Sequence, residues 1–303
     1  MTNSARPCLK WAGGKTQLLD QIAARLPAEL RAGKLARYVE PFVGSGAVFF
    51  FVAENFPTRE YFLSDLNPEL VLVYRVIRAN VDALIAALTK IERKYFKLAP
   101  DAQKKFFYDT RAKFNATRAH LDCDNFQPEW IARAAQIIFL NRTCYNGLFR
   151  VNARGGFNVP FGSYKNPRIC DAENLRAVAR LLQRATIEQG DFAACARVVD
   201  RDTFVYFDPP YRPLSATASF TAYARAEFDD AAQRRLAEFY RALDARGAKL
   251  MLSNSDPKNV NPDDDFFEQL YAGFRITRVS AARMINSVAS KRGAINELIV
   301  TNY

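Results

Sequence analysis

The sequence has a single histidine, His120, and its five cysteines are scattered without a C-x-x-C pair. Zinc sites are built mainly from these two residue types at short spacings, so a metal centre is not expected. An odd number of scattered cysteines also argues against a disulfide framework. The sequence therefore points to chemistry that needs neither a bound metal nor a disulfide.

Long apolar runs are also missing. No stretch of about eighteen uncharged apolar residues occurs, which argues against a transmembrane helix. The N-terminal segment MTNSARPCLKWAGGK lacks the apolar centre of a secretion signal. We therefore expect a cytoplasmic protein that does not enter a membrane.

Acidic residues are outnumbered by basic ones. The chain has 43 Lys and Arg against 32 Asp and Glu, a net charge of +11, and its isoelectric point is near 9.5. Such values are typical of nucleic-acid-binding proteins. A generally basic surface without a polyanionic partner is the alternative.

Short apolar segments alternate with amphipathic helical segments, which favours an α/β architecture. The predicted strands are residues 36–42, 60–66, 202–208, 248–254 and 296–303. Residues 228–247 are predicted to form a crossover helix with Asp229 as N-cap and Gly247 at its end. Residues 68–140 contain no convincing strand and are predicted to form successive helices, so a helical insertion interrupts the sheet.

A glycine turn follows the first predicted strand in YVEPFVGSGAVFFFV. Gly44 and Gly46 allow the backbone to approach a ligand closely, and the following helix offers its N-terminal amides. Phe49 stands where the dinucleotide fingerprint has a third small residue, which argues against a standard NAD site. Asp65 closes the next strand, where such folds place an acid on the ribose. We expect a nucleotide-like ligand, and a simple tight turn is the alternative.

The N-terminal segment KWAGGKTQLL contains a tryptophan, Trp11, between Lys10 and Lys15. It is not a phosphate loop, because Leu9 stands where the Walker pattern has glycine and no strand precedes it. An exposed tryptophan would be costly there unless it bound something. We expect a binding role, and the alternative is a glycine turn before a helix.

The segment FVYFDPPYRP ends a buried strand on a carboxylate, Asp208. Pro209 and Pro210 hold φ at about −65° and donate no amide hydrogen, so the turn is rigid and its carbonyls can accept. A carboxylate beside a carbonyl suits an amino group with two hydrogens, and the Tyr211 ring can stack on a flat heterocycle. The alternative is that Asp208 only caps a turn. Such a cap would explain an Asp-Pro pair alone better than it explains the full sequence Asp-Pro-Pro-Tyr.

EPFVGSG followed by DPPY resembles the two main motifs of the S-adenosylmethionine-dependent amino methyltransferases, and KWAGGK resembles the DNA adenine methylase (Dam) family in particular. The motif order is that of the alpha class. Further matches cover nearly the whole chain: NRTCYNGLFRVNARGGFNVPFGSY at 141–164, PLSATASFTAY at 213–223 and RGAINELIVTNY at 292–303. The resemblance implies a Rossmann-like methyltransferase sheet flanked by helices, formed by residues 1–67 and 170–303, and an inserted, mainly helical target-recognition domain with a β-hairpin at 68–169.

The resemblance also implies roles for individual residues. S-adenosylmethionine would be bound by Lys10, Trp11, Ala12, Gly13, Lys15, Glu40, Pro41, Phe42, Gly44, Ser45, Gly46, Asp65, Asp191, Phe192 and Asp208. The catalytic residues would be Asp208, Pro209, Pro210 and Tyr211, with Asp208 and the Pro209 carbonyl on the amino group of a flipped adenine and Tyr211 stacked on its ring. None of the cysteines lies in a nucleophile motif, which argues against methylation of a cytosine ring carbon.

Residues 149–162 are predicted to form two short strands joined by a turn near Gly155 and Gly156. Such a ribbon fits the major groove, where arginine reads guanine in bidentate fashion, and an ordinary exposed hairpin is the alternative. By resemblance, double-stranded DNA with a GATC-like site would be contacted by Lys10, Tyr145, Asn146, Leu148, Arg150, Asn152, Asn158 and Pro160.

Three classes of function stay open at this point. The leading one is a site-specific DNA adenine methyltransferase that acts as a monomer, alone or beside a cognate restriction nuclease. An enzyme that methylates adenine in RNA, or the amino group of cytosine, would use the same acceptor geometry. A nucleic-acid-binding protein with an inactive pocket is disfavoured, because residues 208–211 are all intact.

Overall fold

The computed structural model describes residues 4–11, 13–117, 126–152, 154–212, 228–282 and 294–303. The chain divides into two compact units. The first comprises Met1–Gly14, Gly44–Asn55 and Asp65–Gly190, and the second comprises Lys15–Val43, Phe56–Ser64 and Asp191–Tyr303. Ala12, the motif at 213–223 and the first two residues of the motif at 292–303 lie outside the described residues.

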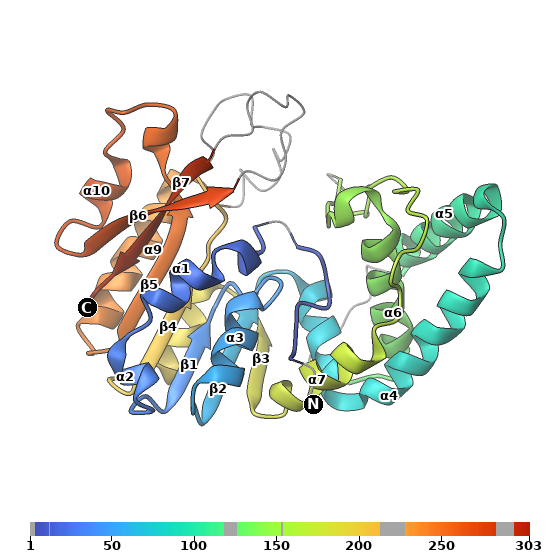
Figure 1. Cartoon of the computed structure of the whole chain (residues 1–303), viewed down its shortest axis with the longest axis horizontal. Coiled ribbons are helices and arrows are strands. Elements are labelled where there is room, and N and C mark those ends of the chain that lie inside the picture. Colours follow the sequence, from blue (N-terminus) through green and yellow to red (C-terminus); the bar gives the residue numbers. More distant parts are fainter. Residues whose placement is uncertain (1–3, 12, 118–125, 153, 213–227, 283–293) are drawn as a thin grey trace. The chain divides into compact units, whose positions relative to one another are not determined.

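A seven-stranded sheet has the strand order β3-β2-β1-β4-β5-β7-β6 (Figure 1). Its strands are β1 (Arg37–Glu40), β2 (Glu60–Asp65), β3 (Ala185–Gln189), β4 (Thr203–Phe207), β5 (Lys249–Ser255), β6 (Arg275–Ala282) and β7 (Ala294–Thr301). Strand β1 is parallel to β2 and β4, and β4 is parallel to β5, whereas β7 is antiparallel to β5 and β6. This mixed sheet with helices between its strands confirms the predicted α/β class.

The five predicted strands correspond to β1, β2, β4, β5 and β7, but β3 and β6 were missed. Both missed strands stand at the ends of the strand order. The sequence of β3, ATIEQ, alternates buried and exposed positions, and β6, RITRVSAA, carries two arginines. Edge strands are partly solvated, so polar residues interrupt their apolar pattern. A search for short apolar runs therefore finds the inner strands and passes over the outer ones.

Strand β4 lies between β1 and β5, and all five of its residues are buried. The chain leaves β1 toward β2 and leaves β4 toward β5, so the crossovers run in opposite directions from this central pair. Ligands of open α/β sheets bind beyond the carboxyl ends of the strands at such a reversal. Glu40, which ends β1, and Asp208, which follows β4, therefore stand at the edge where a ligand is expected.

Helix α9 (Asp230–Asp244) is the predicted crossover helix of the second unit. The Asp229 side chain caps it by accepting a 2.9 Å hydrogen bond from the Ala232 amide. Gly247 follows its end with a φ of 83°, a conformation that favours glycine. Phe228 and Leu236 pack with β4 and β5 in the core of this unit.

The other helical segments of the second unit are η1 (Lys15–Gln17), α1 (Leu19–Ala24), α2 (Ala28–Arg31), η4 (Phe192–Val198), η6 (Pro257–Asn259) and α10 (Phe266–Leu270).

The first unit is mainly helical. Its helical segments are α3 (Ala47–Asn55), α4 (Pro68–Phe96), α5 (Pro100–Ala116), α6 (Glu129–Thr143), η3 (Tyr145–Gly147) and α7 (Ala172–Leu182). Helix α4 packs against α6 and α7, and α5 packs against α6 (Figure 1). Among the described residues of 68–140 no strand occurs, which confirms the predicted helical region. The assignment of 68–169 to target recognition stays a prediction. In the described parts of the chain, no helix is both long and apolar enough to cross a bilayer.

The loop from 149 to 162 keeps the predicted turn but not the predicted pair of strands. Val151 and Phe157 form an isolated antiparallel bridge, and the Asn152 amide donates to the Gly156 carbonyl at 2.8 Å. The side chain of Asn115, from α5, accepts from the Phe157 amide and donates to its carbonyl. The Asn152–Gly156 and Asn158–Arg150 hydrogen bonds flank the bridge, so the backbone groups of Phe157 point away from Val151 and are bound by Asn115 instead.

Candidate active site and DNA interface

Asp208 forms an ion pair directly after β4. Its Oδ1 lies 2.7 Å from the Lys15 Nζ and accepts a 3.2 Å hydrogen bond from the Ser253 Oγ. The Lys15 side chain is 5% exposed and the Asp208 side chain 19%. Both contacts use Oδ1, and a carboxylate has further lone pairs on Oδ2 with which to accept a hydrogen bond from a ligand.

Burial raises the pKa of Asp208 above its ordinary value. The Lys15 ammonium and the Ser253 hydroxyl act in the opposite direction, because both favour the charged carboxylate. The acid is thus placed where water is scarce, and Lys15 is the main group that supports its ionisation.

Tyr211 is fixed at its hydroxyl and at its ring. The hydroxyl donates to the Glu297 carboxylate, and the Lys15 Nζ lies over the ring, 4.5 Å from its centroid. Burial raises the pKa of Tyr211 well above its ordinary value and also raises the pKa of Glu297. A neutral, oriented tyrosine ring is suited to stacking on a flat partner.

The glycine turn belongs to the first unit, where Asp65 caps it. Its carboxylate accepts hydrogen bonds from the Gly44 amide (3.1 Å) and the Asn67 amide (2.9 Å), and Tyr74 donates to the Gly44 carbonyl (2.8 Å). Gly44 and Gly46 have φ values of 47° and 72°. A Cβ on Gly46 would lie 3.0 Å from the Tyr74 hydroxyl. Glycine at 46 is therefore required by backbone conformation and by packing within the unit.

Two acids end the first two strands in different surroundings. Burial raises the pKa of Asp65 to about 6, against the opposing effect of its two backbone amides. Each Asp65 oxygen accepts one hydrogen bond and can accept another, which fits hydroxyl donors. Glu40, at the end of β1, is 2% exposed and accepts a 2.7 Å hydrogen bond from Tyr38.

Asp191 and Phe192 lie at the start of η4, where their side chains have partners within the second unit. Asp191 accepts from the Ala193 amide at 3.0 Å and pairs with Arg235. Burial raises the pKa of Asp191, but Arg235 and the amide outweigh this effect and hold it below its ordinary value. Phe192 is 2% exposed and packs against the half-buried Phe42, with ring centroids 5.5 Å apart. Their assignment to the cofactor stays a prediction. The other described members of the expected cofactor set are the exposed Gly13 and the buried Pro41 and Ser45.

Lys10 and Trp11 of the N-terminal motif pack on the segment 141–164 of the first unit. Trp11 stacks on Phe149, with centroids 5.4 Å apart and planes at 20°, and the Lys10 Nζ lies 4.8 Å from the Tyr164 ring centroid. Asn141 is 2% exposed, accepts from the Lys10 amide and donates to the Lys10 carbonyl, both at 2.8 Å. The tryptophan is therefore explained in part by packing, and Asn141 is a connecting residue that the sequence did not reveal.

Tyr145 presents an aromatic ring to solvent. Its side chain is 55% exposed, and its amide donates to the Pro160 carbonyl at 2.8 Å. The next two residues, Asn146 and Gly147, have φ values of 54° and 64°. A Cβ on Gly147 would lie 2.3 Å from the Lys10 Cδ, so only glycine fits there. An exposed aromatic ring beside a left-handed asparagine is uncommon and is suited to contact with a partner.

The remaining residues of the expected DNA interface lie around the loop turn. Arg150 is exposed, and its Nε donates to the Asn158 Oδ1 at 2.8 Å. The Asn152 side chain is used within the turn, where its Oδ1 accepts from two backbone amides at 3.0 Å. Leu148 is half-buried and Pro160 is exposed.

Sequence reasoning missed several side chains that surround the D-P-P-Y turn: Lys15 as the partner of Asp208, and Arg212, Gln233, Ser253, Asn254, Ser255 and Glu297. A signal was available for three of them. The polar run 253–255 ends the buried strand β5, just as Asp208 follows β4. Polar residues at the carboxyl ends of inner parallel strands gather at one edge of the sheet.

Comparison with known proteins agrees with these features. The profile of the D12 class N6 adenine-specific DNA methyltransferases matches residues 11–285. The Type II methyltransferase M.MjaIII of Methanocaldococcus jannaschii is 50% identical over 299 residues, which cover 98% of this chain and 99% of the relative. The DNA adenine methylase of Haemophilus influenzae is 36% identical over 97% of this chain and 92% of its own length. That of Escherichia coli is 35% identical over 97% of this chain and 94% of its own length.

The expected resemblance to the DNA adenine methylases is thereby confirmed, and the seven-stranded sheet with its flanking helices agrees with the Rossmann-like methyltransferase fold that it implied. The chain belongs to the D12 class N6 adenine-specific DNA methyltransferase family.

Proposed function

We propose that this protein transfers a methyl group from S-adenosylmethionine to the exocyclic amino nitrogen of adenine in double-stranded DNA, within GATC. The observation that carries the proposal is the Asp208 carboxylate after β4, paired with Lys15 and followed by two prolines. An ionised acid beside a carbonyl is a double acceptor for an amino group with two hydrogens. Family membership supports the type of reaction.

In this proposal Asp208 and the Pro209 carbonyl each accept one hydrogen of the adenine amino group, and Tyr211 stacks on the flipped base. The two acceptors orient the nitrogen lone pair and stabilise the positive charge that develops on nitrogen. S-adenosylmethionine supplies an electrophilic methyl carbon: the C–N bond forms as the C–S bond breaks, that electron pair stays on sulfur, and nitrogen then releases one proton to water. The contribution of the protein is alignment and charge stabilisation.

The first unit contains donors and acceptors that fit the cofactor. We assign the ribose hydroxyls to Asp65, whose two oxygens can accept further hydrogen bonds, and the methionine part to the turn at Gly44 and Gly46. We assign recognition of the target sequence to residues 141–164, with Tyr145 entering the base stack and Arg150 reading a guanine.

We further propose a cytoplasmic monomer that works either alone or beside a cognate restriction nuclease. The surplus of eleven positive charges supports a polyanionic partner. The name of the M. jannaschii relative, a Type II methyltransferase, supports a restriction context for this chain.

Expression in a host without adenine methylation tests the function. Sequencing that maps every methylated adenine, together with digestion by nucleases that distinguish methylated from unmethylated GATC, should show methyladenine at GATC. Asp208→Asn should lower the transfer rate by about 10²–10³-fold, because the acceptor charge is lost without a change of shape. Asp82→Asn, at an aspartate that is 76% exposed, is the matched control. Methyl groups only on RNA or on cytosine, or no methylated base, would refute the proposal.

A further inference from the structure

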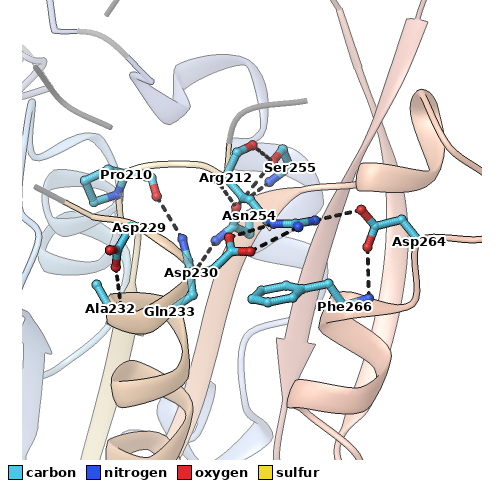
Figure 2. Close-up of polar contacts among 10 residues, drawn as sticks. All are labelled: Pro210, Arg212, Asp229, Asp230, Ala232, Gln233, Asn254, Ser255, Asp264 and Phe266. Carbon is cyan, nitrogen blue, oxygen red and sulfur yellow. Dashed lines mark hydrogen bonds and ion pairs between the residues drawn. The ribbon is translucent and has the colours of Figure 1, made fainter. Parts of the chain in front are cut away.

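The D-P-P-Y turn after β4 is held by side chains of other elements. Pro209 and Pro210 have no N–H group, so the turn lacks two of the donors that a loop ordinarily uses. Figure 2 shows what binds its backbone instead: Gln233 Nε2 donates to the Pro210 carbonyl (3.1 Å), and the Arg212 amide donates to Asn254 Oδ1 (3.2 Å). The turn is therefore bound on both sides of Tyr211.

Gln233 and Asn254 form one interlocked pair. Asn254 Nδ2 donates to Gln233 Oε1 (3.3 Å), and Asn254 Oδ1 accepts from the Ser255 amide (2.9 Å) as well as from Arg212. If the Gln233 amide turned over, its oxygen would face the Pro210 carbonyl. If the Asn254 amide turned over, its NH2 group would face two N–H groups. Each amide therefore has one favourable orientation, and together they fix the direction of the Pro210 carbonyl.

Both amide side chains are fully buried, since Gln233 and Asn254 are each 0% exposed. Burying a polar side chain costs free energy unless hydrogen bonds compensate. Here the compensating partners include the backbone of the turn and the other amide. A shift of the turn would break these bonds inside the protein, so the pair stabilises one conformation of the turn.

Arg212 fixes the exit of the turn (Figure 2). Its Nε and Nη2 donate to Asp230 at 2.8 and 3.2 Å, and its Nη1 donates to Asp264 at 2.7 Å. The guanidinium carbon lies 4.2 Å from the Phe266 ring centroid. Ser255 Oγ donates to the Arg212 carbonyl at 2.7 Å. The exit is thus tied to α9, to the start of α10 and to the end of β5.

The register of the sheet explains why the end of β5 reaches the turn. Phe207 is the partner of Leu252 in the parallel ladder of β4 and β5, so the residues that follow each of them run side by side. Ser253 then binds Asp208 at 3.2 Å, and the next two residues bind the end of the turn. Residues 253–255 therefore bind the turn at successive positions along its length.

We propose that Gln233 and Asn254 are positioning residues for methyl transfer. Proline fixes φ but leaves ψ free, so the two prolines alone do not set the direction of the carbonyl oxygens. The amide pair restrains the chain directly after the Pro209 carbonyl, which is one of the two acceptors assigned to the adenine amino group. The inference rests on the proposed function, because it needs that acceptor role.

Two measurements separate positioning from folding. The stoichiometry of S-adenosylmethionine binding in calorimetry reports the folded fraction, and the single-turnover rate constant on a GATC duplex at saturating enzyme and cofactor reports alignment. Gln233→Leu removes the amide at similar volume. We expect its rate constant to fall about 10- to 100-fold, with unchanged stoichiometry and with dissociation constants for cofactor and duplex within about threefold of wild type.

Ser255→Ala is the second variant, because it deletes only a hydroxyl, which donates to the Arg212 carbonyl (2.7 Å) and lies 3.4 Å from Asn254 Oδ1. We expect it to fold and to lower the same rate constant by about two- to tenfold. Gln183→Leu is the matched control: Gln183 is exposed and donates to the Arg78 carbonyl (2.9 Å) at the end of α7, and its loss should leave the rate constant unchanged.

The outcomes distinguish this inference from the proposed function. A wild-type rate constant in both Gln233→Leu and Ser255→Ala would overturn the positioning role, although the proposed function would stand. The same conclusion would follow if both variants bound less S-adenosylmethionine per chain but kept the wild-type rate constant, because only folding would then be affected. If Gln233→Leu does not fold, the rate constant of Ser255→Ala decides. If the wild-type protein itself methylates no adenine, the function fails and the inference fails with it.

Discussion

Lys15 supports the charged form of Asp208. Burial raises the pKa of this acid, and the ammonium 2.7 Å away opposes that change. In its ionised form the carboxylate accepts hydrogen bonds at both oxygens, so the proposed acceptor role requires ionisation. The methyl-transfer rate should therefore fall on the acid side as Asp208 becomes protonated.

Replacing Lys15 by Met removes the opposing charge, and we expect the pKa of Asp208 to rise further. A higher carboxyl pKa means that a higher pH is needed for ionisation. The fall of the single-turnover rate on the acid side of its pH profile should therefore begin at a higher pH. Rates measured over a pH series at saturating DNA and cofactor give this profile. Lys34→Met, at an exposed lysine, is the control. If the acid side of the pH profile is unchanged in Lys15→Met, Lys15 does not affect the pKa of Asp208.

Arg150 is oriented by a neighbouring amide, because its Nε donates to Asn158. The two terminal nitrogens then form the end that would meet a guanine edge. We expect Arg150→Ala to lose about 1–3 kcal/mol of discrimination at one base pair, and Asn158→Ala to relax the same base pair by less. Initial rates on duplexes altered one base pair at a time measure both effects. Equal loss on every duplex would instead indicate a phosphate contact.

At the scale of elements, α4 and α6 are joined by a buried ion pair. Glu69 is 0% exposed and accepts from Arg133 Nε at 3.0 Å. Arg133 also donates to the Phe114 carbonyl at 3.1 Å, and its guanidinium carbon lies 4.2 Å from the Phe114 ring centroid. One arginine thus holds three helices of the first unit together.

Removing one member of such a pair is strongly destabilising, so we expect Arg133→Met to lower the free energy of unfolding by about 3–5 kcal/mol. Urea denaturation followed by circular dichroism measures this loss. Arg176→Met breaks the ion pair with Asp82, whose side chains are 53% and 76% exposed. That control should change stability by less than about 1 kcal/mol. Equal losses in the two variants would contradict the structural importance of the buried pair.

Most helices and strands could be predicted from local sequence patterns, but for different reasons. Strands β1 and β4 are short buried runs, and α9 carries both its N-cap, Asp229, and its terminal glycine. Strand β6 could not be predicted in this way, because an edge strand tolerates arginines, and in the loop at 149–162 the predicted strands are reduced to the bridge between Val151 and Phe157. Solvation is decided by neighbours in space, which a local pattern does not contain.

At the scale of the whole molecule, the net charge of +11 makes a prediction about binding. Each phosphate contact releases counterions, so the logarithm of the DNA association constant should fall linearly with the logarithm of salt concentration. We expect similar slopes for duplexes with and without GATC, because phosphate contacts carry little sequence information. Fluorescence anisotropy over a salt series measures both slopes. Cofactor binding in the same series is the control and should change little, and a flat DNA affinity would show that the basic surface does not contact phosphates.

The sequence alone was sufficient to identify where chemistry is concentrated. Asp208 after a buried strand, the two prolines behind it, the glycine turn at 44–46 and the order of the motifs are properties of contiguous residues. Such properties follow from φ restrictions, missing amide hydrogens and hydrophobic periodicity, all of which act within a few residues. The α/β class could therefore be predicted before any contact was known, and the resemblance of the motifs to those of the DNA adenine methylases implied the family.

The partners of those residues were established by the fold. Lys15 meets Asp208 because the segment Lys15–Val43 and β4 belong to the second unit, and Asn254 meets the turn because Phe207 is in register with Leu252. The interlocked amides, the raised pKa of Asp208 and the orientation of Arg150 all depend on which distant side chains come within hydrogen-bonding distance. Register and packing set those distances, and they arise only when the chain has folded.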